Sequence, residues 1–381
     1  MSQSGRYSPP PPQDVIYGQP VASALTDELE RTGAQRVVFV TNTSLTGAGG
    51  LAETVTNALG AACLAEVSGI RAHSPREDVV RITATLRDTG ADLVIALGGG
   101  SVCDATKAAC LALANDVCTV DDIDRIRVGN PVAPATLRYI SIPTTLSAGE
   151  YTAIAGVTDE RIPRKEALIH PSLAPDVVIL DAAMTVATPP RLYFGTGIRA
   201  VDHAVETWCS INVTPLTEAS SLHALRILPQ ALAKSKADPD DLDTRLACLI
   251  GAWLSIQGVA TGVDLGASHG IGHVLGGTAG MPHGETSCVM LPHVLRYNNA
   301  VNGERQAILA AAMGDPDTSA ADQIQALVAS LDLPGRLRDA GVSKEILPTI
   351  AEESMLDMWI PTNPRTIAGP QDVLPLLQAA W

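Results

Sequence analysis

Three histidines in the second half of the chain have a spacing that could support proton transfer or metal binding. His269 and His273 are four residues apart, so on a helix they would share one face. His283 lies between Pro282 and Gly284, a setting typical of a turn or a helix start. Imidazole carries protons near neutral pH and is a common ligand of transition metals. The alternative is a set of unrelated histidines on helices.

A second group of reactive side chains lies upstream, in segment 197–206 (GIRAVDHAVE), which contains Arg199, Asp202 and His203. A guanidinium is always charged, cannot ligate a cation, and offers a bidentate fork to a carboxylate. Arg199 therefore predicts a local positive pocket for an acidic substrate. Because Arg199 and Asp202 are three residues apart, an ion pair within one helix is the alternative.

A glycine-rich loop in the first half could bind the phosphates of a nucleotide. Gly98, Gly99, Gly100 and Ser101 follow an apolar run and precede a helical pattern that contains Asp104. Glycines let the backbone approach a ligand closely, and a helix start presents free N–H groups to a pyrophosphate. The alternative is a tight turn made by three glycines.

Polar residues also follow other apolar runs. Thr144, Thr145 and Ser147 come after the run 138–143, and their hydroxyls could bind a cofactor or simply form a turn. Asn42 follows an earlier run of the same kind. A carboxylate at that position would repel the 2′-phosphate of NADP, whereas a neutral asparagine is compatible with both NAD and NADP.

The expected elements bring these loops to one edge of a sheet. Apolar, β-branched runs at 36–41, 92–97, 138–143 and 176–180 alternate with helical patterns. Such alternation predicts a parallel sheet covered by helices, with ligands at the carboxyl ends of the strands. After about residue 186 the strand signals stop and amphipathic segments follow, which predicts helices.

The sequence thus predicts an N-terminal α/β nucleotide-binding domain and an all-α C-terminal domain. The expected divisions are a disordered tail at 1–14, the α/β domain at 15–185 and the helical catalytic domain at 186–381. The tail contains a proline run and lacks the apolar segment of a secretion signal. Segment 246–263 is apolar but contains Ser255 and Gln257, so a buried helix is expected there rather than a membrane span.

Charge and cysteine usage narrow the function classes. The net charge of −15 over 381 residues argues against a surface for nucleic acid or an anionic membrane. The seven cysteines form no Cys-x-x-Cys pair, as expected of a protein in a reducing cytosol. We therefore expect a cytoplasmic protein that acts on a small molecule.

Together these motifs resemble the iron-containing (group III) alcohol dehydrogenases, which share the dehydroquinate synthase-like architecture. Segment 98–101 resembles the family's GGGS motif, with Asp104 and Lys107 at the family's spacing. Segment 143–150 (PTTLSAGE) is similar to the family's PTTxGTGSE but one residue shorter, as in maleylacetate reductases. The histidine segments resemble TGMDALxHAxE and HxxxHxLGG…PHG, and the resemblance spans roughly residues 15–381.

In metal-dependent members of this family an aspartate and three histidines hold iron or zinc. His203, His269 and His283 match the histidine ligands, and Arg199 stands where the aspartate would be. A like charge there weakens cation binding, so the resemblance implies a metal-free site similar to that of maleylacetate reductases. Asp202 is not expected to replace the ligand, because successive helical residues point about 100° apart. Iron or zinc held by the three histidines is the alternative.

Roles for the site residues follow from the same resemblance. Without a metal, Arg199 and the histidines must stabilise the negative charge that develops on the substrate. His273 or His269 is the expected proton donor, and His203 and His283 are expected to form polar walls of the pocket.

Several other residues match the family less sharply. Lys165 is expected to contact the cofactor, whereas Asp181, Glu206 and segment 363–365 are expected to be structural. Arg71 and His73 either line the pocket or belong to a solvated loop.

The resemblance implies NAD(P)H-dependent reduction of a small carboxylated keto or ene-keto acid such as maleylacetate, in the catabolism of aromatic compounds, by a homodimer. At Arg199 the chain departs from typical maleylacetate reductases, which more often have asparagine. Three alternatives stay open: a metal-dependent alcohol or aldehyde dehydrogenase, a lyase of the dehydroquinate synthase type that uses NAD, and a nucleotide-binding protein without turnover.

Overall fold

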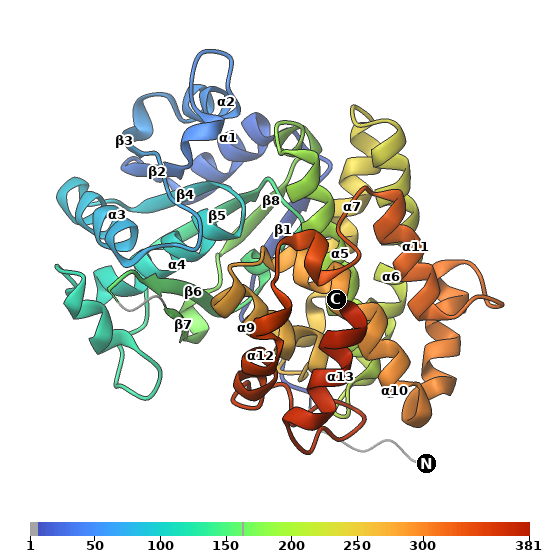
Figure 1. The fold of residues 1–381 in the computed structure, drawn as a ribbon. Coiled ribbons are helices and arrows are strands. Elements are labelled where there is room, and N and C mark those ends of the chain that lie inside the picture. Colours follow the sequence, from blue (N-terminus) through green and yellow to red (C-terminus); the bar gives the residue numbers. More distant parts are fainter. Residues whose placement is uncertain (1–6, 162–163) are drawn as a thin grey trace. The chain divides into compact units, whose positions relative to one another are not determined.

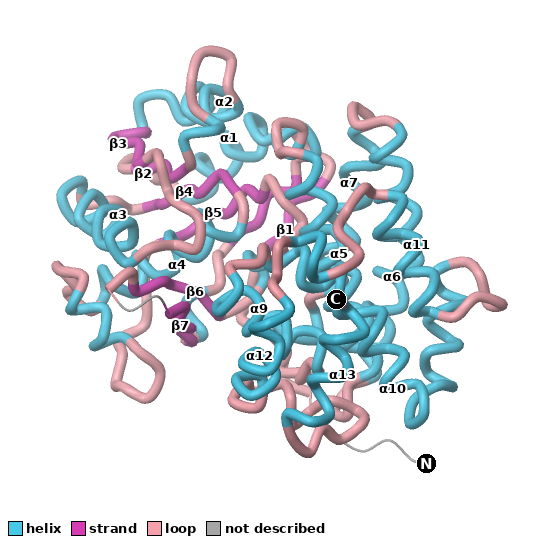
Figure 2. Tube along the Cα trace, in the orientation of Figure 1, coloured by secondary structure: helices cyan, strands magenta, loops and turns pink. Residues whose placement is uncertain are grey.

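The computed structural model describes residues 7–161 and 164–381, and it divides by internal contacts into two units. The first unit is Pro10–Thr188, and the second is Pro189–Trp381 together with the described residues up to Pro9. Figure 1 shows both units as ribbons, and Figure 2 shows that the strands belong to the first of them. The predicted order of an α/β part followed by a helical part is confirmed.

A six-stranded sheet forms the centre of the first unit. Its strand order is β1-β8-β5-β4-β2-β3, and every neighbouring pair is parallel. The strands are β1 (Asp14–Tyr17), β2 (Val37–Thr41), β3 (Cys63–Val67), β4 (Leu93–Gly98), β5 (Arg138–Pro143) and β8 (Val177–Leu180). The parallel sheet expected from the apolar runs is therefore confirmed for β2, β4, β5 and β8.

Helices cover both faces of this sheet. They are α1 (Val21–Thr32), α2 (Leu51–Leu59), α3 (Arg76–Thr89) and α4 (Gly100–Ala114). Along β2, Val38 and Val40 pack into one hydrophobic cluster with α3 and α4, while Val37 and Phe39 pack into another with α1 and α2. A strand buried on both faces must be apolar throughout, which explains why its sequence gave so clear a signal.

An antiparallel hairpin, β6 (Ile154–Asp159) and β7 (Arg164–Ile169), lies outside the main sheet and was not predicted. It is tied to the start of α3 through Arg76, whose side chain is fully buried. The Arg76 guanidinium forms ion pairs with Asp159, Glu166 and Asp124. These contacts satisfy a charge that would otherwise be costly to bury.

The start of the first unit differs slightly from the predicted tail. Residues 1–6 lie outside the described residues. Gln13 donates hydrogen bonds to the carbonyl oxygens of Glu150 and Pro175, and Asp14 begins β1 opposite Val177. The predicted disordered segment 1–14 was therefore too long at its C-terminal end, because these residues are held by the sheet.

The second unit consists of helices and loops in its described residues. The helices are α5 (Pro190–Cys209), α6 (Pro215–Ala237), α7 (Leu242–Ser255), α8 (Gln257–Ala260), α9 (Ala267–Ala279), α10 (His283–Met313), α11 (Ala320–Ser330), α12 (Leu347–Ser354) and α13 (Pro370–Ala380). A hydrophobic cluster joins α9, α10, α12 and α13. The apolar stretch 246–263 is divided between α7, α8 and the loop that follows, and no helix in the described part of the chain is long and apolar enough to cross a membrane.

Candidate active site

The glycine-rich loop lies where β4 passes into α4, as predicted. Gly99 precedes the helix, and its carbonyl oxygen accepts from the N–H groups of Val102 and Cys103. A Cβ on Gly98 would lie 2.5 Å from Val102 Cγ2, and one on Gly99 would lie 2.9 Å from Thr145 Cγ2. Close packing alone therefore requires glycine at both positions, whatever ligand the loop binds.

The loop after β5 packs directly on the glycine-rich loop. Thr144 N–H donates to the Gly98 carbonyl at 3.0 Å, and the Thr145 and Ser147 hydroxyls lie 3.2 Å apart. A Cβ on Gly100 would lie 3.3 Å from Ser147 Oγ. The structure thus brings together the predicted cofactor residues of two different strand ends.

Asn42, after β2, has a buried Oδ1 that accepts no hydrogen bond from any described residue. An unsatisfied buried acceptor is uncommon in folded proteins. Lys165 lies in β7 opposite Thr158, but its side chain lies outside the described residues.

Other predicted cofactor residues make contacts within the protein. Ser101 Oγ accepts from the N–H of His73, and Asp104 accepts from the N–H of Gly156 at 3.1 Å. The buried Lys107 ammonium donates to three backbone carbonyls, those of Gly149, Thr152 and Ile154. These bonds hold β6 and the segment just before it against α4.

Arg71 is engaged by acidic side chains of its own unit. Its guanidinium pairs with Asp78 at 3.3 Å, with Glu77 at 3.4 Å and with Glu160 at 3.0 Å. His73 has a positive φ of 66°, which is unusual for a residue with a side chain. Of the two interpretations left open, these ion pairs and the 47% exposure of the Arg71 side chain favour the solvated loop.

The histidine site is built on α5 and the start of α9. Along α5, Asp202 and His203 each lie three or four residues from both Arg199 and Glu206, and all four side chains are buried. The Glu206 carboxylate accepts from the N–H groups of Gly266, Ser268 and His269, and so caps α9 from another helix. A Cβ on Gly266 would lie 3.0 Å from Glu206 Oε1, so glycine is needed for this approach.

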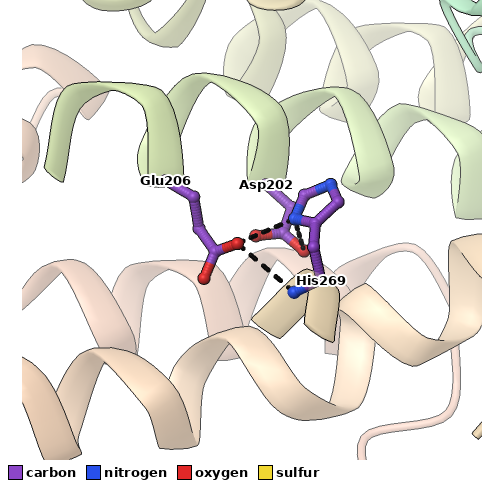
Figure 3. Close-up of side chains that lie close together, drawn as sticks. All are labelled: Asp202, Glu206 and His269. Atoms are coloured by element: carbon purple, nitrogen blue, oxygen red, sulfur yellow. Dashed lines mark hydrogen bonds and ion pairs between the residues drawn. The ribbon is translucent and has the colours of Figure 1, made fainter. Parts of the chain in front are cut away.

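His269 projects from the first turn of α9 toward this acidic pair, as Figure 3 shows. Its Nδ1 lies 2.8 Å from Glu206 Oε2 and 3.4 Å from Asp202 Oδ2. Asp202 Oδ2 also accepts from the hydroxyls of Ser268 (2.7 Å) and Ser287 (2.6 Å). Asp202 Oδ1 and His269 Nε2 are buried and have no hydrogen-bond partner in the described chain.

Burial controls the protonation of these groups. It raises the pKa of Asp202 to about 6, and burial together with the neighbouring Asp202 charge raises the pKa of Glu206 to about 8. Burial, with the Arg199 charge, lowers the pKa of both His203 and His269 well below the ordinary value. Both imidazoles are therefore neutral near pH 7, and Nδ1 is the His269 nitrogen that shares a hydrogen bond with Glu206.

Arg199 is nine-tenths buried within the same site. Its Nη1 donates to Ser287 Oγ at 3.2 Å, and this is the one hydrogen bond that its guanidinium makes to the described chain. No carboxylate of the described chain lies within ion-pair distance of it, so the alternative of an intrahelical pair with Asp202 is not realised. Burial lowers the pKa of Arg199, and the charge of Asp202 opposes this shift.

His203, His273 and His283 complete the group of histidines around His269. The His203 and His269 rings are stacked with centroids 4.9 Å apart, and the His273 and His283 rings meet edge to face at 6.2 Å. His269 and His273 lie on α9, and His283 begins α10, as the spacing predicted. The Trp359 ring contacts both His269 (5.5 Å) and His273 (5.0 Å).

Residues outside the histidine motifs complete the site, and the sequence interpretation missed them. They are Ser268, Ser287, Asp357 and Trp359. The two serines could have been predicted from their places in the chain, beside His269 and four residues after His283. Nothing in the local sequence pattern points to Asp357, because its partner His273 is 84 residues away.

The metal chemistry implied by the resemblance can be tested on these donors. Among the described residues, the group that lies at ligand spacing is Asp202, Glu206 and His269, and not the expected set of His203, His269 and His283. In that group both Glu206 oxygens, Asp202 Oδ2 and His269 Nδ1 are already hydrogen-bonded. A metal ion there would have to displace those bonds next to a buried guanidinium. Asp202 Oδ1 and His269 Nε2, by contrast, have no partner in the described chain, so these donors favour neither a metal-free nor a metal-bound site.

Comparison with known proteins identifies the family. A model described as iron-containing alcohol dehydrogenase matches residues 12–182, and one for the C-terminal part of the Fe-containing alcohol dehydrogenase family matches residues 194–381. Dehydrogenase FUM7 of Gibberella moniliformis is 35% identical to this chain, and the match covers 92% of each protein. Lactaldehyde reductase of Escherichia coli K12 is 32% identical, and the match covers 96% of this chain and 97% of that protein. The crystal structure of maleylacetate reductase from Agrobacterium tumefaciens superposes with a TM-score of 0.85 at 28% identity, over 100% of this chain and 99% of that chain. The chain belongs to the iron-containing alcohol dehydrogenase family and is an NAD(P)-dependent oxidoreductase of that family.

Proposed function

We propose that the protein uses NAD(P)H to reduce a small keto or ene-keto acid of the maleylacetate type, without a metal ion, in the catabolism of aromatic compounds. The observation that carries this proposal is the state of Arg199. A guanidinium that is nine-tenths buried, makes one hydrogen bond and has no carboxylate within ion-pair distance is a binding site for an anion. A substrate carboxylate would supply that anion.

The glycine-rich loop supports the nucleotide part of the proposal. The N-terminus of α4 offers backbone N–H groups to a pyrophosphate, and Thr145 and Ser147 add hydroxyls beside it. The unsatisfied Oδ1 of Asn42 is a suitable acceptor for a ribose hydroxyl of the cofactor.

Hydride transfer to the electrophilic carbon leaves negative charge on the substrate oxygen, as an enolate or alkoxide, and a proton must follow. Arg199 stabilises that charge electrostatically. Of the two expected proton donors, His273 is favoured: its side chain is 36% exposed, so solvent can resupply it. His269 is fully buried, and its Nδ1 is already hydrogen-bonded to Glu206.

A metal-dependent alcohol or aldehyde dehydrogenase is the second candidate. It is favoured by the ligand spacing of Asp202, Glu206 and His269, and by relatives named as lactaldehyde reductase and as alcohol dehydrogenases. In that case the metal would polarise the carbonyl or alkoxide oxygen.

A chelator experiment separates the two candidates. We expect protein dialysed against EDTA, with metal content measured on the same sample, to oxidise NADH or NADPH with maleylacetate as fast as untreated protein. Arg199→Asp removes the carboxylate-binding fork and supplies an acidic ligand at the position where metal-dependent members of the family have aspartate. This variant should lose the activity with maleylacetate and gain affinity for Zn²⁺. Wild-type activity that vanishes with the chelator and returns with iron or zinc would establish the second candidate instead.

Cofactor choice gives a further prediction. Replacing Asn42 by aspartate should raise KM for NADPH by roughly tenfold or more while changing KM for NADH little, because a carboxylate repels the 2′-phosphate. The measurement is initial rate against each cofactor at saturating substrate. Asn42→Ser, which is neutral, serves as the control, and equal changes in both KM values would remove Asn42 from the ribose site.

A further inference from the structure

His273 has a carboxylate partner that the family motifs do not include. Its Nδ1 lies 2.9 Å from Oδ2 of Asp357, which comes from the loop after α12. The Asp357 side chain is 12% exposed and the His273 side chain 36% exposed, so the pair lies at the border of the buried site.

The loop holds Asp357 in a defined orientation. Its Oδ1 accepts from the Trp359 N–H at 2.9 Å, and its own N–H donates to the Ser354 carbonyl at 3.0 Å. The Trp359 ring packs against the His273 ring at 5.0 Å with an interplanar angle of 33°. The imidazole is therefore held both by a hydrogen bond in its plane and by an aromatic contact on its face.

Gly270, one turn before His273 on α9, makes room for this carboxylate. A Cβ at Gly270 would lie 3.1 Å from Asp357 Oδ1 and 3.1 Å from the Ile360 side chain. Few Cβ atoms approach a neighbour so closely, so a side chain there would push the loop away from α9. Of the two glycines between His269 and His273, Gly270 is thus the one that the Asp357–His273 pair requires.

We propose that Asp357 is a positioning residue that holds the proton of His273 on Nδ1 and leaves Nε2 as the nitrogen that serves the substrate. The proposal rests on the proposed function, in which His273 supplies the proton after hydride transfer. In that step the Nε2–H bond breaks as the proton passes to the substrate, and the ring keeps its Nδ1–H bonded to Asp357. The Asp357 carboxylate accepts from Nδ1–H before and after the transfer and so keeps Nε2 available to the substrate.

The tautomer of His273 tests this directly and requires no substrate. In protein labelled with ¹⁵N-histidine and assigned with a His273→Gln variant, we expect the neutral ring of the wild type to carry its proton on Nδ1. In Asp357→Ala the neutral ring should shift toward the Nε2–H form. Gly270→Ala, which keeps the carboxylate but displaces it, should shift the tautomer in the same direction.

Kinetics give the second readout. Asp357→Ala should lower kcat roughly 10- to 100-fold with little change in KM, and added formate should restore part of the loss. The matched control is Glu353→Gln, because Glu353 also links α12 to α9, by accepting from the Thr278 hydroxyl, but touches no imidazole. We expect this variant to keep the wild-type kcat.

The outcomes separate this inference from the proposed function. An unchanged His273 tautomer in Asp357→Ala, or a fall in kcat no larger than that of Glu353→Gln, would overturn the role of Asp357. A wild type that does not turn over maleylacetate would overturn the proposed function, while the tautomer would still report on Asp357. If Asp357→Ala fails to fold, Asp357→Asn, which has nearly the same shape but no charge, takes its place in both measurements.

Discussion

Replacing Arg199 by methionine is expected to lower kcat/KM for a dicarboxylate substrate by roughly two to three orders of magnitude. Methionine fills similar space along α5 but provides neither the charge nor the N–H donors. A buried, charge-assisted contact of this kind is worth about 2–5 kcal/mol when one partner is truncated. The measurement is steady-state oxidation of NAD(P)H with maleylacetate, and both KM and kcat should worsen, because the carboxylate is bound before and during hydride transfer.

Two variants make this test specific. Arg191→Met removes an arginine from the same helix, but Arg191 is 65% exposed and pairs with Glu285, so we expect nearly wild-type turnover. Arg199→Lys keeps a positive charge but loses the planar fork, so it should recover only part of the activity. Wild-type kcat/KM in Arg199→Met would show that the guanidinium does not bind the substrate.

The fold was predictable where strands are buried on both faces. In β2 and β4 every residue is buried, and their sequences are continuous apolar runs. The edge strand β3 alternates between exposed and partly or fully buried residues, and the edge strand β1 is exposed at both ends, so neither gave a distinct signal. The hairpin of β6 and β7 depends on the burial of Arg76, a long-range contact that a local pattern does not record.

The site was predictable where its residues lie close together in the chain. The HxxxH spacing on α9 and the helix start at His283 follow from helical geometry alone. The hydrogen bonding of Arg199 does not follow from local helical geometry, because it depends on how α10 brings Ser287 to α5. Asp202 was expected to point away, yet it shares the His269 environment, because α9 begins beside that face of α5.

Glu206 was expected to be structural, but its partners lie 60 to 63 residues away in the chain, so no local pattern predicts them. Glu206→Ala is expected to lower the free energy of unfolding by about 3–5 kcal/mol, because the N–H groups of Gly266, Ser268 and His269 would lose their acceptor in a buried place. His269 would also lose the partner that fixes its Nδ1. Urea unfolding followed by circular dichroism measures the change.

The control is Glu218→Ala, which removes a carboxylate that pairs with Arg305 near the surface of the same unit and should cost less than about 1 kcal/mol. Equal losses for the two variants would show that Glu206 does not hold the start of α9.

The unfolding measurement also tests whether Glu206 binds a metal ion. If Glu206 acts by capping α9, EDTA leaves the wild-type unfolding curve in place and only the mutation moves it. If Glu206 were a metal ligand, EDTA alone would shift the wild-type curve toward that of Glu206→Ala, because metal binding to the folded state adds to its stability.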